Sequence, residues 1–251
     1  MYDFQKADMW KRISAWLFDF ILISIVVMGL VCLLAFVLIT DSHLDGYSAA
    51  LEEYKAEFGR ETSMNAAEYE ALSDEEKINF QRIRSGMYYH HDMLVTKFLL
   101  IASLSITLSH FLMEFIIPLA FGNGQTLGKK IFGIAVMRVD GVKVTPFIMF
   151  VRSMLGKCTI ETLIPVAIII MIFAGIMGIV GIAVLAALLL SQIVLICATK
   201  ARTPIHDMLA QTVTADMASQ MIFDTPEELL AYKQKIHAEM VSDMREESRN
   251  S

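Results

Sequence analysis

Arg12 and Asp19 are charged residues at the start of an apolar run that extends to Thr40. A charge inside a membrane helix costs roughly 2.5 to 3.5 kcal/mol on insertion scales, so it needs a partner, a water-filled cavity or a function. The seven-residue separation equals two helical turns, which places both side chains on one face, about 10 Å apart along the axis. Asp19 is therefore interpreted either as a structural counter-charge or as an ion or proton site.

Glu114 interrupts a second apolar run, Phe98 to Phe121, four residues before Pro118. Proline lacks an N–H group, so the carbonyl of Glu114 loses its helical donor and a kink is expected. A kink beside a carboxylate is a candidate ligand site. Alternatively, Glu114 reaches the cytoplasmic interface. His110, one turn earlier, is expected to hydrogen-bond to a neighbouring backbone or hydroxyl group.

Other residues of reactive type lack the context that their chemistry requires. The segment 122–130 contains glycines and two lysines but lacks the Walker spacing and follows an apolar run, which excludes a nucleotide-binding loop. His206 beside Asp207 resembles a general base, but no Ser or Cys nucleophile lies in a recognisable motif. The three cysteines match no metal or disulfide spacing. We therefore expect no enzyme activity, no cofactor and no metal.

The elements that carry these residues are predicted to be membrane helices. Of the 251 residues, 55% are hydrophobic and 19% are charged, a composition unsuited to a water-soluble domain. The runs Ile13–Thr40 and Phe98–Phe121 each suit one crossing, since roughly 20 helical residues span the hydrocarbon core. The uncharged run Thr162–Thr199 would extend about 57 Å as one helix, which is too long for a single crossing.

Charge asymmetry predicts how these crossings are oriented. Segment 41–97 is rich in Glu and Asp, whereas segment 122–161 is basic, so the positive-inside rule places 122–161 and both termini in the cytoplasm. An even number of crossings must then separate Glu161 from the C-terminal segment. The long apolar run is therefore predicted to be a helical hairpin that starts near Pro146 and turns near Gly175, Gly178 and Gly181. The alternative is one continuous helix with a small-residue packing face.

Two segments outside the membrane have their own patterns. In 41–97, Ser73 followed by Glu76 has the form of a capping box, which predicts an acidic α-helical insert; a partly disordered loop is the alternative. On the cytoplasmic side, an Asp-Gly turn at 140–141 between alternating β-branched residues predicts a β-hairpin, and 212–216 is a second β-like run. A polar helix is predicted from Thr225 to about Arg245.

The predicted fold is an all-α membrane protein: a four-helix transmembrane bundle with a small α-helical extracytoplasmic insert and a short cytoplasmic β-hairpin. Along the chain these parts are the N-terminus with the first membrane helix (1–40), the insert (41–97), the second membrane helix (98–121), the cytoplasmic loop with the β-hairpin (122–145), the transmembrane helical hairpin (146–199) and the cytoplasmic C-terminal segment (200–251).

Three motifs in this order resemble the RDD family of bacterial membrane proteins, named for one arginine and two aspartates. The segment Arg12–Asp19 (RISAWLFD) resembles the first-helix motif. The segment Gly124–Lys130 (GQTLGKK), continuing to Arg152, resembles the central block. The segment Arg202–Val213 (RTPIHDMLAQTV) resembles the terminal block, with Asp207 as the second aspartate.

The resemblance implies a protein of the bacterial cytoplasmic membrane with a transport role, and sodium/proton exchange is proposed for some members. Two features depart from the family pattern: Gln211 stands where a glycine is common, and the insert 41–97 is longer than expected. The motif residues expected to form a charge network are Arg12, Asp207, His206, Arg152, Gln125, Thr126 and Lys129.

Two functions from different classes remain open. The first is secondary ion transport, with Asp19 as the central carboxylate, Glu114 as a second ligand, and Arg12 with Asp207 organising the cytoplasmic mouth. Its partners are membrane lipid, a sodium ion or proton and, because four helices form a small pathway, further copies of the chain in a homo-oligomer; nucleic acid is not expected. The second is a non-transporting scaffold or accessory protein that binds a partner through its acidic insert or C-terminal helix.

Overall fold

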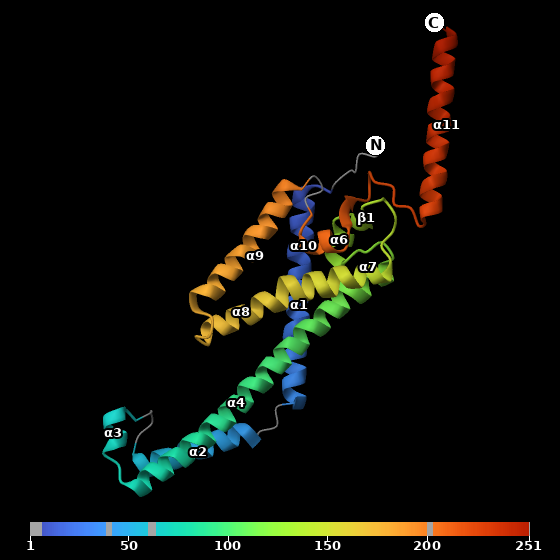
Figure 1. Ribbon diagram of the computed structural model, residues 1–251. Coiled ribbons are helices and arrows are strands. Elements are labelled where there is room, and N and C mark those ends of the chain that lie inside the picture. Colours follow the sequence, from blue (N-terminus) through green and yellow to red (C-terminus); the bar gives the residue numbers. More distant parts are fainter. Residues whose placement is uncertain (1–6, 39–41, 60–63, 200–202, 251) are drawn as a thin grey trace. The chain divides into compact units, whose positions relative to one another are not determined.

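Helices dominate the computed structural model, which describes residues 7–38, 42–59, 64–199 and 203–250 (Figure 1). It divides into two compact units, Val27–Ser105 and the rest of the chain. Four helical stretches in the described residues are long and apolar enough to cross a membrane: Met9–Leu38, Asp74–Phe121, Pro146–Phe173 and Gly178–Ala198. The predicted all-α membrane class is confirmed. The predicted boundaries at residues 40–41 and 200, and the motif residue Arg202, lie outside the described residues.

The last two membrane stretches form the predicted helical hairpin. The first limb consists of α7 (Pro146–Phe150), the π-helix η2 (Val151–Leu163) and α8 (Ile164–Phe173). The second limb, α9 (Gly178–Ala198), returns beside α8 (Figure 1). Gly175 has φ +73° in the turn, a conformation that glycine adopts without steric cost. A Cβ on Gly181 would lie 2.6 Å from Cγ1 of Ile172, so the missing side chain lets the two limbs pack closely.

The second membrane stretch begins much earlier than predicted. It consists of α4 (Asp74–His110), the π-helix η1 (Phe111–Ile116) and α5 (Ile117–Phe121). Its 48 residues would span about 72 Å, more than a hydrocarbon core, so its polar first part extends beyond the membrane. No proline interrupts the helix before Pro118, and the Ser73 capping box starts it: the Ser73 N–H donates to Glu76 Oε2 at 2.8 Å.

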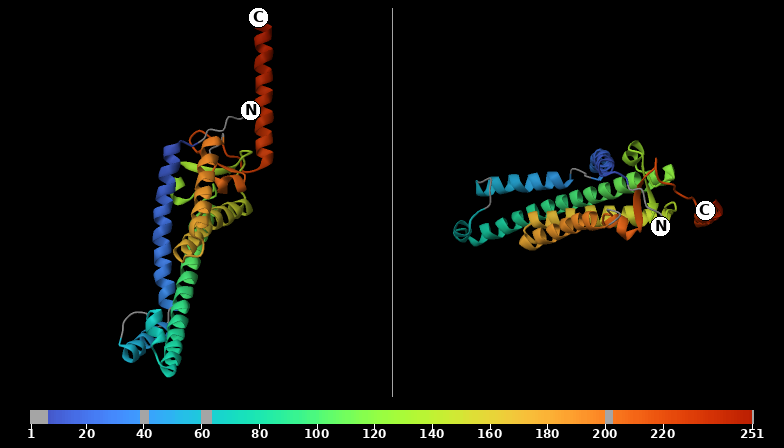
Figure 2. Two further views of the ribbon diagram at one scale, coloured as in Figure 1. Left: turned by 60° about the vertical axis from the view of Figure 1, so that its left-hand side comes forward. Right: turned by 90° about the horizontal axis from the view of Figure 1, so that it is seen from above.

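The insert is a small helical unit, as predicted. Helix α2 (Ser42–Phe58) lies alongside the first part of α4, with the short helix α3 (Ala66–Glu70) at the end of the pair (Figure 2). Its core is aromatic: Tyr54 and Phe80 are 5% and 4% exposed, and their ring centroids lie 6.0 Å apart. These contacts between α2 and α4 explain how a charged segment forms ordered structure.

A histidine pair also joins α2 to α4. The Nδ1 atoms of His43 and His90 lie 3.2 Å apart, so one ring donates and the other accepts. The ring of His90 lies against Gly46, where a Cβ would be 2.4 Å from its Cε1 atom. Desolvation of the imidazole, together with the nearby Lys97 and His90, lowers the pKa of His43. The pair is therefore arranged for neutral rings.

The two-stranded sheet differs from the predicted hairpin in which strand β1 pairs with. Strand β1 (Ile134–Arg138) pairs antiparallel with β2 (Thr212–Asp216), the second β-like run. The Asp-Gly turn forms, since the N–H of Gly141 donates to the carbonyl of Arg138 at 3.0 Å, but only a single bridge follows it, between Met137 and Lys143. The N–H of Lys143 donates instead to the carbonyl of Phe223, which diverts the returning strand.

Short helices α6 (Leu127–Ile131) and α10 (Ile205–Leu209) precede β1 and β2, and the long helix α11 (Pro226–Asn250) follows the sheet. Leu229 of α11 packs with Val142 and Phe223. The sheet and its two short helices thus form the platform that positions the charged residues described next.

Candidate functional site

Asp19 joins the first membrane helix, α1 (Met9–Leu38), to the short helix α6. It is 5% exposed, and both carboxylate oxygens accept hydrogen bonds: Oδ1 from the N–H of Gly128 at 2.8 Å, and Oδ2 from the hydroxyl of Thr126. A Cβ on Gly128 would lie 2.4 Å from the carbonyl oxygen of Ala15. The central motif therefore supplies a glycine where α6 meets α1 together with two donors, and the first-helix motif supplies their acceptor, Asp19.

Asp207 and Arg152 form an ion pair whose side chains are both 1% exposed. Arg152 Nε lies 2.7 Å from Asp207 Oδ1, which also accepts from the hydroxyl of Thr212 at 2.9 Å. Arg12 Nη2 lies 4.0 Å from the other oxygen, Oδ2. Burial opposes the charge of Asp207, but Arg152 and His206 outweigh it and hold the pKa of Asp207 well below its usual range. Asp207 thus lies between two arginines, with Arg152 on one carboxylate oxygen and Arg12 near the other.

The two π-helical segments carry the next pair. Glu114 on η1 lies 2.5 Å from Lys157 on η2, measured from Oε1 to Nζ. The other oxygen of Glu114 is buried without a hydrogen-bond partner among the described residues. The π-helix η1 immediately precedes Pro118, where the sequence predicted a kink. Because π-helical turns are frequent at functional sites, Glu114 and Lys157 are candidate functional residues.

Glu161, also on η2, contacts α10 through His206. The backbone N–H of His206 lies 3.1 Å from Glu161 Oε1, and its Nδ1 lies 2.9 Å from the same oxygen. The backbone of Gly156 allows this approach, since a Cβ there would be 2.5 Å from Cβ of His206. Burial lowers the pKa of His206 in spite of the adjacent carboxylates of Asp207 and Glu161, so its ring is neutral at neutral pH.

Lys129, on α6, adds a further buried cation to this site. It is 8% exposed, and its Nζ is buried with no hydrogen-bond partner in the part of the chain that the structure describes. Burial, reinforced by the positive charges of Arg152 and Lys157, lowers the pKa of Lys129 to about 7. Asp19 and Glu114 act in the opposite direction but do not compensate. Lys129 can therefore hold or release a proton near neutral pH.

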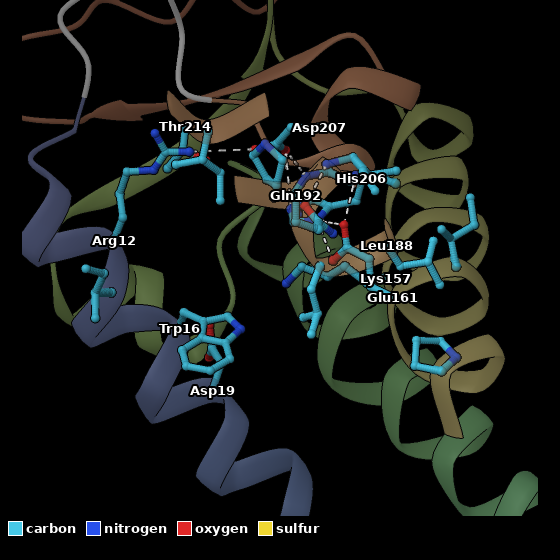
Figure 3. A pocket seen from close by; sticks show the side chains of 18 of the residues that line it. Arg12, Trp16, Asp19, Lys157, Glu161, Leu188, Gln192, His206, Asp207 and Thr214 are labelled. Atoms are coloured by element: carbon cyan, nitrogen blue, oxygen red, sulfur yellow. Dashed lines mark hydrogen bonds and ion pairs between the residues drawn. The ribbon is translucent and has the colours of Figure 1, made fainter. Parts of the chain in front are cut away.

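Most of the charged side chains described above, but not that of Glu114, line a cavity of about 600 Å³. Figure 3 shows Arg12, Trp16 and Asp19 on α1, facing Lys157, Glu161, His206 and Asp207 across it. The remaining wall is apolar and comes mainly from α8 and α9. The cavity thus combines a charged end with a hydrocarbon wall.

Not every predicted site residue belongs to this cluster. Gln125 donates to the carbonyl of Ile134 at 2.9 Å and thereby supports β1. His110 Nδ1 lies 2.9 Å from the carbonyl of Ile106, and its Nε2 lies 3.4 Å from the hydroxyl of Thr162. These are the backbone and hydroxyl partners that the sequence analysis expected. Among the described residues no group of three or more His, Cys, Asp or Glu is placed to hold a metal ion.

The sequence analysis did not identify Lys157, Glu161 or Thr212 as residues that contact the buried charges of this site. Lys157 and Glu161 are four residues apart, hence on one helical face, in a segment that was assigned mainly by its net charge. That spacing was the available signal.

Comparison with known proteins gives a family and no individual relative. No curated protein and no solved structure matches the chain. The model of the RDD family matches residues 6–211, which include Arg12, Asp19, the central block, Arg152 and Asp207. The buried contacts of Asp19 and Asp207 give a physical reason why aspartate occupies these motif positions. The chain belongs to the RDD family of membrane proteins.

Proposed function

We propose that this protein is a secondary transporter that exchanges a small cation, such as sodium, for a proton. The observation that supports the proposal is Lys129, a buried ammonium group at a cavity with no hydrogen-bond partner among the described residues and with its pKa lowered to about 7. A group with these properties changes its protonation state in the physiological range without first breaking a hydrogen bond.

The proposed exchange follows from electrostatic coupling. Asp19 and Glu114 both favour the protonated form of Lys129. A cation that binds near these carboxylates reduces their effect and promotes release of the Lys129 proton, and protonation of Lys129 in turn repels the cation. Because both oxygens of Asp19 already have donors, the proton-carrying role moves from Asp19, where the sequence alone suggested it, to Lys129.

The orientation and assembly of the transporter are part of the proposal. We place the basic segment 122–145 and both termini in the cytoplasm of a bacterium, which puts the cluster at the cytoplasmic side. Cysteines introduced at Ser85 and at Ser219 in a cysteine-free background should be labelled from the outside and the inside respectively. We further propose a homo-oligomer, because four helices offer one chain a narrow pathway.

Reconstitution in liposomes tests the transport proposal. Vesicles with an internal pH dye are challenged with sodium, lithium or potassium, using wild type, Lys129→Met and Lys130→Met. Lys130 is the matched control, because it is adjacent in sequence but exposed, with its Nζ 3.8 Å from the centroid of the Phe121 ring. We expect cation-dependent proton movement in wild type and Lys130→Met and none in Lys129→Met. A folded wild type that moves no protons with any cation contradicts the proposal, as does undiminished exchange in Lys129→Met.

One observation favours the second candidate function, a non-transporting accessory protein. Helix α11 extends 25 residues and exposes Leu230, Met240 and Met244, whereas Leu229 is its buried hydrophobic residue among those described. An exposed apolar series on a charged helix suits a protein partner. Under this hypothesis, cross-linking through α11 would trap a partner, and the liposome assay would give no exchange.

A further inference from the structure

The cavity has an apolar wall that is open at membrane depth. Trp16 on α1, Ile169 on α8 and Leu189 on α9 line it, and their side chains are 60%, 42% and 66% exposed. All three belong to helices that are long and apolar enough to cross a membrane. Exposed apolar side chains on such helices face hydrocarbon rather than water. An occupant can therefore enter this cavity sideways from the bilayer.

Two residues that line the opposite end of the cavity, Lys129 and Arg152, carry buried donors that lack a partner in the described part of the chain. Lys129 Nζ and Arg152 Nη1 are buried, and neither has a hydrogen-bond partner among the described residues. The two cations also repel each other, since Arg152 contributes to the lowered pKa of Lys129. Burying a donor without a partner costs free energy, and burying two like charges together adds to that cost. Arg152 is already ion-paired with Asp207 through Nε, so the acceptor that is missing among the described residues is one for its Nη1 and for Lys129 Nζ, and an anion would supply it.

The carboxylates on the same wall do not replace such an anion. Both oxygens of Asp19 have donors, and Glu161 accepts from the backbone and from the ring of His206. The remaining oxygen, Oδ2 of Asp207, has no hydrogen-bond partner among the described residues, but it lies 4.0 Å from Nη2 of Arg12 and belongs to the carboxylate that is ion-paired with Arg152. Lys157 is neutralised by Glu114. The donors without partners thus belong to Lys129 and Arg152.

We propose that the cavity binds an acidic phospholipid of the surrounding bilayer, with the phosphate on Lys129 and Arg152 and an acyl chain along the wall formed by Trp16, Ile169 and Leu189. Basic pockets between membrane helices on the cytoplasmic side are suited to acidic headgroups, and a volume of about 600 Å³ lies in the range of small-molecule sites. The open apolar wall identifies the source as the membrane rather than soluble phosphate. The binding requires no transport, so it stands or falls independently of the exchange proposed above.

Native mass spectrometry of the purified full chain tests this site. Phosphatidylglycerol and phosphatidylcholine with identical acyl chains are titrated into wild type, Lys129→Met and Lys130→Met, and inorganic phosphate is tested as a competitor. We expect wild type to prefer phosphatidylglycerol by about tenfold or more, because phosphatidylcholine has the same phosphate but adds a choline cation, which the positive charges of Lys129 and Arg152 would repel. Lys129→Met should lose this preference, and Lys130→Met should keep it. Leu185→Trp, which fills the apolar end, should weaken both lipids.

The result that overturns the proposal is equal affinity of wild type for the two lipids. Competition by inorganic phosphate at lipid-like concentrations would also overturn it, because the ligand would then be soluble. If Lys129→Met fails to fold, the wild type still provides a test: raising the pH from 6 to 9 neutralises Lys129 and should lower phosphatidylglycerol affinity without changing that of phosphatidylcholine. A preference that is constant over this range contradicts the role of Lys129.

Discussion

Replacing Asp207 by Asn should destabilise the protein strongly while leaving its shape almost unchanged. Asn keeps the volume and can accept from the hydroxyl of Thr212, but it removes the charge that faces Arg152 at 2.7 Å and Arg12 at 4.0 Å. Arg152 is 1% exposed, so its guanidinium would remain charged, buried and without a counter-ion. The loss is therefore that of breaking a buried ion pair.

The expected loss is about 3 to 5 kcal/mol, the usual cost of removing one partner of a buried pair. The second variant, Arg152→Met, should cost a comparable amount, because it leaves Asp207 buried with Arg12 at a longer distance. The double variant should recover much of the loss, since neither charge then remains unpaired. The coupling free energy between Asp207 and Arg152 should accordingly be large, and the double variant should be more stable than the sum of the two single effects predicts.

Thermal midpoints of purified protein in detergent, combined into a double-mutant cycle, measure this coupling. Asp140→Asn is the matched control, because its ion pair with Arg138 is short, at 2.6 Å, but the two side chains are 34% and 40% exposed. Exposed pairs contribute at most about 1 kcal/mol, so this control should shift the midpoint little. The reasoning is refuted if Asp207→Asn destabilises no more than Asp140→Asn, or if the double variant is as unstable as the sum of the singles.

Three further predictions concern other parts of the chain. Gly128→Ala should lower the thermal midpoint, because its Cβ would meet the α1 backbone at 2.4 Å, whereas Gly29→Ala, with nothing within 4 Å, should not. Because the pKa of His43 is lower in the folded state, the packing of α2 on α4 should be most stable above pH about 6.5 and weaken as the pH falls to 5. Smaller amide protection factors in α2 at pH 5 than at pH 7, each taken relative to the intrinsic exchange rate at that pH, with no such change in His43→Gln, check this. Gln211→Gly should raise the midpoint by the equivalent of about 1 kcal/mol, since Gln211 has φ 51° and left-handed conformations cost L-residues roughly that amount; an unchanged midpoint would contradict it.

The membrane helices and the helical hairpin could be predicted, because the helices depend on composition and the hairpin follows from an even number of membrane crossings. The length of an uncharged run and the sign of the flanking charges require no knowledge of contacts. Element pairing was less predictable. The Asp-Gly turn forms at 140–141, but β1 pairs with a strand about 75 residues later, since alternation identifies strands and not their partners. The sequence analysis divided α4 into an insert helix and a separate membrane helix, because the change from polar to apolar residues was interpreted as a boundary.

The partners of the buried charges show the same limit. The sequence required a partner for Asp19 and, in the structural interpretation, suggested a cation. The partners are instead the Thr126 hydroxyl and the Gly128 N–H, more than 100 residues away. Only the position of α6 decides between a hydrogen-bonded and an ion-paired carboxylate. A charge in an apolar run thus indicates that a partner exists, without identifying its chemical type.

Lys129 could not have been separated from Lys130 by sequence, since the two are adjacent and identical in type within a basic segment. Their difference is burial: Lys129 lies at the cavity among Arg152, Lys157 and Asp19, and Lys130 is exposed beside Phe121.

Because the proposed proton and the proposed lipid phosphate both bind Lys129, proton binding and lipid binding must be thermodynamically linked. A bound acidic lipid raises the pKa of Lys129, and protonation strengthens lipid binding by the same factor. Replacing phosphatidylcholine by phosphatidylglycerol in the liposomes should therefore shift the pH profile of exchange toward alkaline pH in wild type and in Lys130→Met. A pH profile that is the same in both lipids would show that the proton site and the lipid site are not the same site.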